Sequence, residues 1–322
     1  MGVALEEPEI EFRTPSEEIS QIANQPWLPV YGVDPTKKRL MRLELENRIP
    51  TEYLAREEIR LAGLRMYEET RSRSRRVYAK GVSIVYIHSG EVLQPAGLPE
   101  SLVIIQVQWS PDGENLALIL ERTKQTELWN IEVKSGKASR LSELEIQAAM
   151  ADVMYWASDS QSLIVKTVSK HIGPKPIRSF VPSGAIIRET GGDPLPAQTH
   201  QGVLRTKWDV TLFEYYFSSQ ISRIRLDGPE VSIGAPGMFR YVRESPDGNY
   251  LLVERLVRPW SFLVNEEQFA YEIEVWNLQT GKAQELASSP LAEYLPHGGG
   301  ECKDRRSGFR MEIRPYCHGC MG

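Results

Sequence analysis

Cysteine and histidine are scarce in this chain of 322 residues. The three cysteines, Cys302, Cys317 and Cys320, all lie near the C-terminal end. The main body therefore has no thiol from which a disulfide framework or a thiolate metal site could be built. Each histidine is interpreted as a solvated turn residue rather than a ligand or a catalytic base. The five histidines are His88, His171, His200, His297 and His318.

Long apolar runs and net basic charge are missing as well. No stretch approaches the roughly 18 consecutive apolar residues that span a bilayer. The net charge of -5 argues against a nucleic-acid-binding protein that depends on overall positive charge. Residues 1–13 are acidic and non-periodic, unlike a signal or transit peptide, and we expect them to be disordered. These features predict a cytoplasmic protein with neither nucleic acid nor membrane among its partners.

The one basic cluster occupies residues 71–76, with the sequence Arg-Ser-Arg-Ser-Arg-Arg. Taken alone, such a cluster is compatible with phosphate contacts. No aromatic residues are interleaved with it to stack on bases. We therefore favour a solvated loop that precedes a strand.

Catalytic motifs are also absent from the sequence. There is no Gly-x-Ser-x-Gly elbow, no glycine-rich phosphate loop and no His-Glu-x-x-His motif. Residues 317–320 form one Cys-x-x-Cys, with Cys302 and His297 upstream, whereas a structural zinc site needs two well-spaced pairs. We predict no catalytic, cofactor-binding or metal-ligating residue and no cofactor. A regulatory module with a zinc-binding tail is kept as a minor alternative.

What the chain does contain is a repeated turn. Residues 109–118 include Ser-Pro-Asp-Gly, residues 244–252 repeat it, and residues 156–164 are a degenerate copy. Proline presets the first turn angle, and glycine supplies the positive φ that closes a hairpin. Asp112 and Asp247 occupy the turn position where an aspartate bonds to the nearby backbone, so we assign them no catalytic role.

A second set of turns marks a longer repeat. Segments of alternating apolar residues end in glycine turns at Gly90, Gly136, Gly228 and Gly281, and the middle interval is about twice as long as either of the others. A unit of about 45 to 50 residues with two hairpins is typical of a four-stranded β-propeller blade. The fold class predicted is therefore all-β, a partial β-propeller of about four to five four-stranded blades. Both a closed four-bladed ring and an arc of a larger ring fit this pattern.

Shorter signals predict the remaining elements. A short helix is expected after Thr14, which caps it, and a second over residues 52–64. A weak hairpin is expected over residues 30–43. The unit between Gly136 and Gly228 is irregular, with loops at 170–176 and 191–196 and a closing strand at 212–217. The expected divisions are a disordered N-terminus (1–13), a helical and extended segment (14–81), an incomplete propeller (82–296) and an atypical tail (297–322).

Several stretches together resemble one family, the chloroplast-type glutamyl endopeptidases of the prolyl oligopeptidase group of serine peptidases. The resemblance runs in order from about residue 14 to residue 296. Ser-Pro-Asp-Gly is unspecific, whereas Leu-Ala-Gly-Leu-Arg and Arg-Pro-x-Ser-Phe are much more specific. The stretches are residues 54–65, 70–73, 109–113, 181–184, 213–216, 258–264 and 290–293.

The resemblance implies an N-terminal propeller that restricts and orients peptides for a C-terminal α/β-hydrolase domain, which cleaves after glutamate. We expect that domain to be absent here, so no catalytic residue carries over and the chain is expected to be inactive alone. Peptides are the expected partners through the full-length enzyme, located in the chloroplast stroma in plant relatives. An open strand edge makes self-association a further expectation. The alternative is a stand-alone propeller that acts as a protein-interaction scaffold.

The resemblance ends abruptly after Pro296. Relatives continue with a glycine-rich turn and a Trp-Arg-Ser-Asp-like strand. Met311-Glu312 must be encoded by ATG-GA(A or G), so the next reading frame there contains TGG, the codon for tryptophan. We therefore hypothesise that the residues after about His297 are a frameshifted tail.

Overall fold

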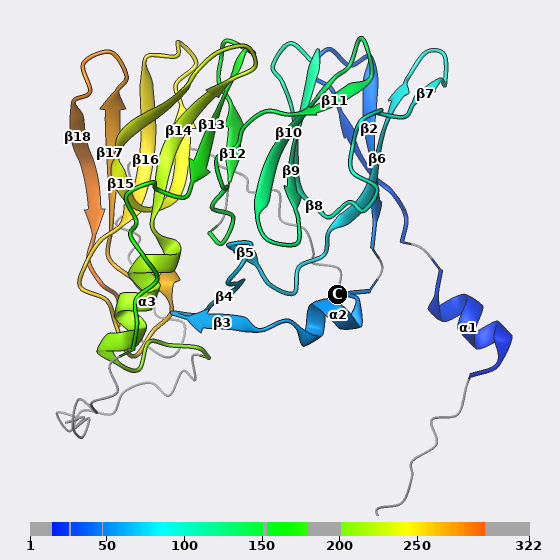
Figure 1. The fold of residues 1–322 in the computed structure, drawn as a ribbon. Coiled ribbons are helices and arrows are strands. Elements are labelled where there is room, and N and C mark those ends of the chain that lie inside the picture. The colour runs from blue at the N-terminus through cyan, green and yellow to red at the C-terminus, as the bar shows by residue number, and fades with distance from the viewer. Residues whose placement is uncertain (1–14, 26, 47, 151–152, 179–200, 294–322) are drawn as a thin grey trace, which may run out of the picture.

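The computed structural model describes residues 15–25, 27–46, 48–150, 153–178 and 201–293. Within these ranges the chain is all-β, with four blades of four antiparallel strands and a few short helices (Figure 1). The predicted partial β-propeller is thus confirmed, and the described residues contain no α/β-hydrolase fold.

Blades 1 and 2 use the chain from Val30 to Arg140. Blade 1 begins well before residue 82, because residues 30–45 form the predicted hairpin and pair with the strand that starts at Ala79. Its strands are β1 (Val30–Val33), β2 (Arg39–Leu45), β6 (Ala79–Tyr86) and β7 (Val92–Leu93). Those of blade 2 are β8 (Ile104–Trp109), β9 (Asn115–Glu121), β10 (Thr126–Glu132) and β11 (Lys137–Arg140).

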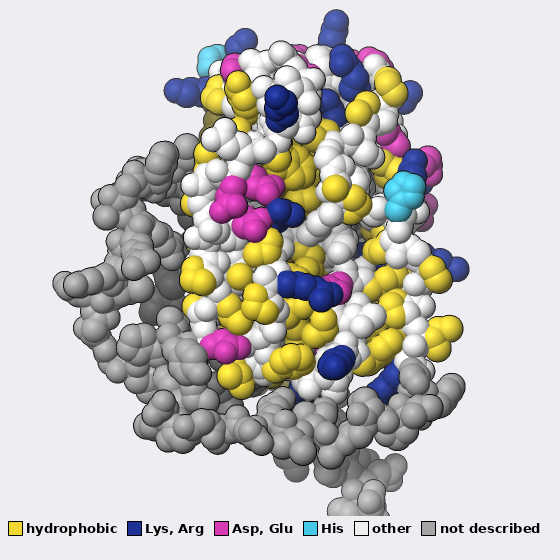
Figure 2. All heavy atoms as spheres, turned by 90° about the vertical axis from the view of Figure 1, so that its left-hand side faces the viewer, with side chains coloured by type: hydrophobic (Ala, Val, Ile, Leu, Met, Phe, Trp, Pro, Cys, Tyr) yellow, Lys and Arg dark blue, Asp and Glu magenta, His cyan; other side chains and the backbone are white. Residues whose placement is uncertain are grey.

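Blades 3 and 4 share one long strand, β15 (Glu230–Glu244). It pairs with β14 through Gly237 and with β16 from Met238 onward. The other strands of blade 3 are β12 (Met154–Trp156), β13 (Ser162–Thr167) and β14 (Ser219–Arg225). Those of blade 4 are β16 (Tyr250–Leu256), β17 (Tyr271–Asn277) and β18 (Ala283–Ser289). Figure 2 shows hydrophobic side chains interspersed with charged ones over this end of the molecule.

Three hydrophobic cores fill the spaces between successive blades. The position of β9 between blades 1 and 3 explains why residues 116–120, Leu-Ala-Leu-Ile-Leu, are apolar at every position. Leu116 and Leu118 pack toward blade 1, whereas Ala117 and Ile119 pack toward blade 3. Successive side chains of a strand point to opposite faces, so a strand between two blades needs both faces apolar. Each fully buried large side chain contributes roughly 1.5–3 kcal/mol.

The repeated turns join first to second strands and connect neighbouring blades. In the turn between β8 and β9, the Asp112 carboxylate accepts a hydrogen bond from Ser110 Oγ at 2.6 Å. The Asp112 N–H donates to Ser160 Oγ of blade 3 at 3.2 Å. Gly113 has a φ of +74°, and a Cβ there would lie 3.0 Å from the Asp34 carboxylate of blade 1. The turn interpretation of this aspartate is confirmed.

The helix predicted over residues 52–64 is wrong beyond its first turn. Ala62 and Gly63 both have positive φ values, as a two-residue hairpin turn requires. Apolar residues alternate on either side of that turn, which favours strands over a continued helix. The elements observed are α2 (Thr51–Ala55), β3 (Glu58–Leu61), β4 (Leu64–Tyr67) and β5 (Ser72–Arg73).

The strand predicted over residues 212–217 is also wrong, because this segment belongs to the helix α3 (Lys207–Phe217). Thr206 and Asp209 form a capping box, in which each side chain accepts a hydrogen bond from the other residue's N–H. Phe213 and Phe217, four residues apart, share the buried face. The large side chains suggested a strand, but the capping residues upstream decide the conformation.

Two smaller differences concern the helices. α1 (Glu17–Ala23) is capped by Ser16, whose Oγ accepts from the Ile19 N–H at 3.4 Å, while Thr14 lies outside the described residues. A 3-10 helix, η1 (Glu266–Gln268), lies between β16 and β17. Residues 170–176 contain no strand, as predicted. The loop at 191–196, the N-terminal residues 1–13 and the tail from 297 lie outside the described residues.

Candidate functional site

One face of the propeller carries a layer that the blade pattern does not require. It consists of the described parts of the connections between the second and third strands of blades 1, 3 and 4, at residues 46–78, 168–218 and 257–270. Figure 1 shows α2, β3, β4, β5 and α3 together on the side of the blades opposite the repeated turns. We call this layer the cap.

The cap has a hydrophobic core of its own. Phe213 of α3 lies at its centre, with its ring 5.7 Å from that of Phe269 and 5.5 Å from that of Trp260, both in edge-to-face geometry. Because the three connections bury side chains against one another, they pack as one unit. The buried residues that the connections contribute are Leu61, Ala62, Leu64, Met66, Leu204, Phe213, Tyr216, Phe217, Val264 and Phe269.

A carboxylate joins α3 to the blade 4 connection. Glu214 Oε1 accepts hydrogen bonds from Trp260 Nε1 and from Arg258 Nε, each at 2.7 Å. Glu293, which follows blade 4, accepts from Ser261 Oγ at 2.6 Å. The polar contacts thus hold the same segments together that the aromatic cluster does.

The β3–β4 turn docks against the blade 4 connection. The Glu266 N–H donates to the Ala62 carbonyl at 2.8 Å. Gly63 has a φ of +83°, and a Cβ at this position would lie 2.5 Å from Cγ of Asn265. Both the left-handed backbone and the close approach therefore require glycine in this Leu-Ala-Gly-Leu turn.

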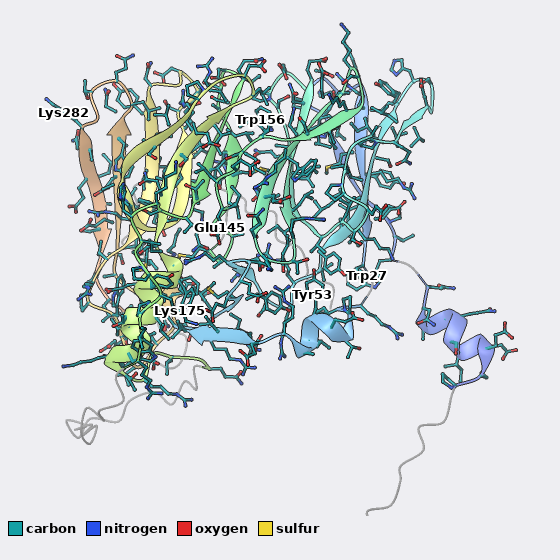
Figure 3. The ribbon with its side chains drawn as sticks, in the orientation of Figure 1. Trp27, Tyr53, Glu145, Trp156, Lys175 and Lys282 are labelled. Carbon is teal, nitrogen blue, oxygen red and sulfur yellow. The ribbon has the colours of Figure 1, made fainter. Side chains whose placement is uncertain are left out.

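The basic cluster is not the solvated loop that we predicted, because Arg71 is buried between the cap and the blades. Its guanidinium pairs with Glu145 at 3.6 Å and lies 4.9 Å from the centre of the Tyr215 ring. Its carbonyl accepts from the Ala148 N–H at 2.8 Å. Burial raises the pKa of Glu145 above its ordinary value, and Arg71 opposes that rise. Figure 3 shows Glu145 between the two halves of the sheet structure.

The first strands of the blades lie side by side. Trp109 Nε1 of β8 donates to the Gly32 carbonyl of β1 at 3.3 Å, and Trp156 Nε1 of β12 donates to the β8 carbonyl of Gln108 at 2.9 Å. Farther along, exposed Arg243 of β15 lies 4.9 Å from the centre of the Tyr155 ring. The described residues of this inner surface offer aromatic and cationic groups.

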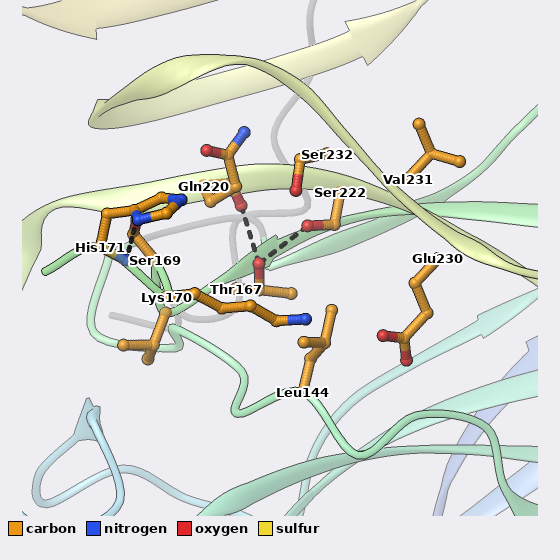
Figure 4. A pocket seen from close by; sticks show the side chains of 11 residues that line it. Leu144, Thr167, Ser169, Lys170, His171, Gln220, Ser222, Glu230, Val231 and Ser232 are labelled. Carbon is orange, nitrogen blue, oxygen red and sulfur yellow. Dashed lines mark hydrogen bonds between the residues drawn. The ribbon is translucent and has the colours of Figure 1, made fainter.

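Figure 4 shows a pocket of about 440 Å³, partly open to solvent, beside the outer strands of blade 3. Its hydroxyl groups bond to one another, as between Thr167 Oγ1 and Ser222 Oγ at 2.9 Å. His171 lines it from a turn, where its N–H donates to Ser169 Oγ at 3.2 Å. Because these lining groups form hydrogen bonds with one another, we assign no catalytic or binding role to this pocket.

The other candidate residues from the sequence either lie in turns or fall outside the described residues. Asp247 accepts from the Asn249 N–H at 3.1 Å within its turn, and His88 lies in the turn after β6. In the described part of the chain, no group of three or more His, Cys, Asp or Glu side chains could hold a metal ion. No described helix is long and apolar enough to cross a membrane. His200, His297, His318 and the three cysteines lie outside the described residues.

Comparison with known proteins finds similar sequences. No family model matches the chain. A protein of Oryza sativa subsp. japonica named "Probable glutamyl endopeptidase, chloroplastic" is 31% identical over 299 residues, which is 88% of this chain. A protein of the same name from Arabidopsis thaliana is 31% identical over 298 residues. The chain is a homologue of the glutamyl endopeptidases. It spans 32% and 31% of the lengths of these two relatives.

Solved structures with similar folds include peptidases. The Pyrococcus horikoshii acylaminoacyl peptidase matches 83% of this glutamyl endopeptidase homologue and 33% of its own chain, with 12% identity and a TM-score of 0.44. The β-propeller domain of the Trilobed protease from Pyrococcus furiosus matches 81% of this chain and 57% of its own, with 10% identity and a TM-score of 0.39.

Proposed function

We propose that this chain is the propeller part of a serine-type glutamyl endopeptidase, in which it gates and orients peptide substrates for an α/β-hydrolase domain. Two relatives with 31% identity over 88% of the chain carry that name, and the chain covers about a third of their length. The proposed location is the cytoplasm, with the chloroplast stroma as the counterpart in plants.

The observation that carries this proposal is where the family resemblance falls in the fold. Four of the seven stretches, at 54–65, 70–73, 213–216 and 258–264, lie in the cap. The stretch at 109–113 lies at the β8–β9 turn of blade 2, and that at 181–184 lies outside the described residues. The stretch at 290–293 joins them, because Leu291 packs against the cap core. Blade packing requires mainly apolar side chains on the strands, whereas the cap contains specific charges and close approaches. This concentration supports a role for the cap that the peptidases share.

Peptide hydrolysis by the purified chain tests the proposal. A fluorogenic peptide with a glutamate before the reporter should remain intact, because the nucleophile and base of the family belong to the hydrolase domain. Cleavage that co-purifies with the protein through successive columns and is abolished by a serine-directed inhibitor would contradict the expectation that the chain is inactive by itself.

Sequencing the gene from the codon of Leu291 onward tests the link to a hydrolase domain. A downstream frame with a Gly-x-Ser-x-Gly elbow would support a propeller that serves a peptidase. A verified stop with no such frame would favour the alternative, a propeller that acts as an interaction scaffold.

A further inference from the structure

The blades at the two ends of the row each have one face that no other blade covers. The three cores between successive blades cover both faces of blades 2 and 3, but only one face of blade 1 and one face of blade 4. We call the two remaining faces end face 1 and end face 4. Figure 1 shows them at opposite ends of the row, so within the described part of one copy they do not meet.

End face 1 carries exposed apolar side chains. Directly paired residues of antiparallel strands lie on the same face of a sheet, and Leu40 pairs with Val33 of β1 and with Val85 of β6. The side chains of Tyr31 and Val33 are 54% and 58% exposed. None of the apolar residues of this face contributes to a hydrophobic core of the described chain. These residues are Tyr31, Val33, Leu40, Val85 and Val92.

End face 4 has the same character. Leu252 of β16 pairs with Val275 of β17, and Tyr250 is 41% exposed. Figure 2 looks onto this end of the molecule, and hydrophobic side chains gather over it. The apolar residues of this face also contribute to none of the cores in the described chain. They are Tyr241, Tyr250, Leu252, Ile273 and Val275.

The second strands of the blades show what end face 4 lacks. On β9 of blade 2, all five residues from Leu116 to Leu120 are completely buried, because a blade lies on either side. On β16 of blade 4, Leu251 and Val253 are completely buried, whereas Leu252 between them is partly exposed. End face 4 therefore has the apolar pattern of an interface between blades without the second blade. An exposed apolar surface of this kind marks an interaction site.

The packing inside the chain predicts which surfaces fit each other. In each of the three interfaces, the face of one blade that points toward the C-terminal end of the row packs on the next blade, on the face that points toward the N-terminal end. End face 4 is of the first kind, and end face 1 is of the second. The remaining match is therefore end face 4 on end face 1, a head-to-tail contact between two copies.

We propose that two copies of this chain pack head to tail, with end face 4 of each on end face 1 of the other, and close a ring of eight blades. Closed propellers have about four to eight blades, so two copies of four blades reach the upper limit and leave no place for a third. This assembly needs no hydrolase domain and goes beyond the proposed function.

Area and charge both fit this assembly. Four strands about 4.8 Å apart, each of about seven residues at about 3.3 Å, give a blade face a footprint of roughly 400 Å². Ring closure buries four such faces, roughly 1,600 Å² in all, which is a standard size for a stable interface. Arg42 of end face 1 pairs with Glu44 at 3.2 Å, and Glu254 of end face 4 pairs with Arg240 at 3.3 Å. These charges would thus be covered as pairs, which costs less than covering single charges.

Sedimentation velocity of the purified full chain tests the assembly. Interfaces of this size bind with a Kd of about 1 μM or tighter, so at about 10 μM the chain should sediment as a dimer. Val33→Glu on end face 1 and Tyr250→Glu on end face 4 each place a charge in both apolar interfaces of the ring. Dimer formation by either variant should need at least about a hundredfold more protein.

The matched control is Val231→Glu, the same change at a strand valine of blade 3. Val231 is 52% exposed and lies on neither end face. Because surface substitutions away from an interface have small effects, this variant should dimerise within about twofold of the unaltered chain.

Mixing the two end-face variants distinguishes head-to-tail packing from any other dimer. The Val33 variant keeps an intact end face 4, and the Tyr250 variant keeps an intact end face 1. At a concentration at which each variant alone is monomeric, an equimolar mixture should therefore contain dimers held by the one unaltered interface.

Four results would overturn the assembly, once circular dichroism shows all three variants to be folded. The first is an unaltered chain that stays monomeric at about 100 μM. The second is a Val33 variant that dimerises as the unaltered chain does, which would mean that end face 4 contacts itself. The others are equal loss of the dimer in the Val231 control and a mixture without dimers. None of these results bears on the hydrolysis and sequencing tests of the proposed function.

Discussion

Replacing Arg76 by methionine should make the folded chain more stable. The substitution keeps an unbranched side chain of similar length but removes a charge that has no ion-pair partner among the described residues. The methionine side chain can therefore still pack against the tyrosine rings that line the same gap, Tyr53, Tyr67 and Tyr78. Most substitutions of partly buried residues destabilise a protein, so a gain would be an unusual and diagnostic result.

The magnitude follows from the shift in the pKa of Arg76. Burial and the neighbouring Arg73 lower the pKa from 12.5 to about 10 against the opposing effect of Glu121, and this net shift corresponds to about 3 kcal/mol of cost to the charged form. Both values lie far above neutral pH, so the folded and unfolded chains are equally protonated there and the full cost applies. Replacement of a buried ion pair by apolar groups is often neutral or gains roughly 1–4 kcal/mol. We expect about 1–3 kcal/mol after loss of the remaining hydration.

Urea unfolding at neutral pH, followed by tryptophan fluorescence, measures the effect. The midpoint should rise without a change of slope, and the gain should be constant from about pH 6 to 9 because no group involved titrates there. The matched control is Arg75→Met, which removes a cation that is exposed and already paired with Glu58. That change should be worth less than about 1 kcal/mol. Loss of stability in the Arg76 variant, or a gain no larger than that of the control, would refute the reasoning.

Three further substitutions test other parts of the fold. Gly63→Ala should cost about 2–4 kcal/mol in thermal unfolding, because of its φ of +83° and the close approach of Asn265; Gly281→Ala, which has open space around it, should cost less. Asp34→Asn should cost about 2–3 kcal/mol at neutral pH. Burial raises the pKa of Asp34, but its hydrogen bonds outweigh that effect, so the pKa in the folded chain is lowered from 3.8. The difference in stability between the unaltered chain and the Asn variant is therefore fully present above pH 3.8 and is lost as the pH falls through the folded pKa. Glu214→Ala should speed hydrogen exchange in α3 while leaving β9 unchanged, as measured by mass spectrometry.

The blades could be predicted from the sequence because their signals are local. Gly90, Gly136, Gly228 and Gly281 each lie between the third and fourth strands of one blade. The turn chemistry depends on a few neighbouring residues, so it survives in any propeller context. The start of blade 1 was harder to locate, because its first hairpin is separated from its third strand by the cap residues 46–78.

The cap was harder to predict because its conformation depends on contacts between distant segments. Local signals were present for α3, in the capping box of Thr206 and Asp209, and for the β3–β4 hairpin, in Ala62-Gly63. The burial of Arg71 had no such signal, since its partners come from the link between blades 2 and 3 and from α3. A basic run in a chain of net negative charge indicates solvent exposure unless tertiary contacts override it.

The charge at Arg76 is the least well compensated of the basic cluster. Its Nε is buried and has no hydrogen-bond acceptor in the described part of the chain, whereas Arg71 pairs with Glu145 and Arg75 pairs with Glu58. Burial and Arg73 lower the pKa of Arg76 by more than Glu121 raises it. The stability of the Arg76→Met variant therefore decides whether Glu121 compensates this charge: a gain means that the charge is a net cost to the fold, and a loss means that Glu121 offsets the cost.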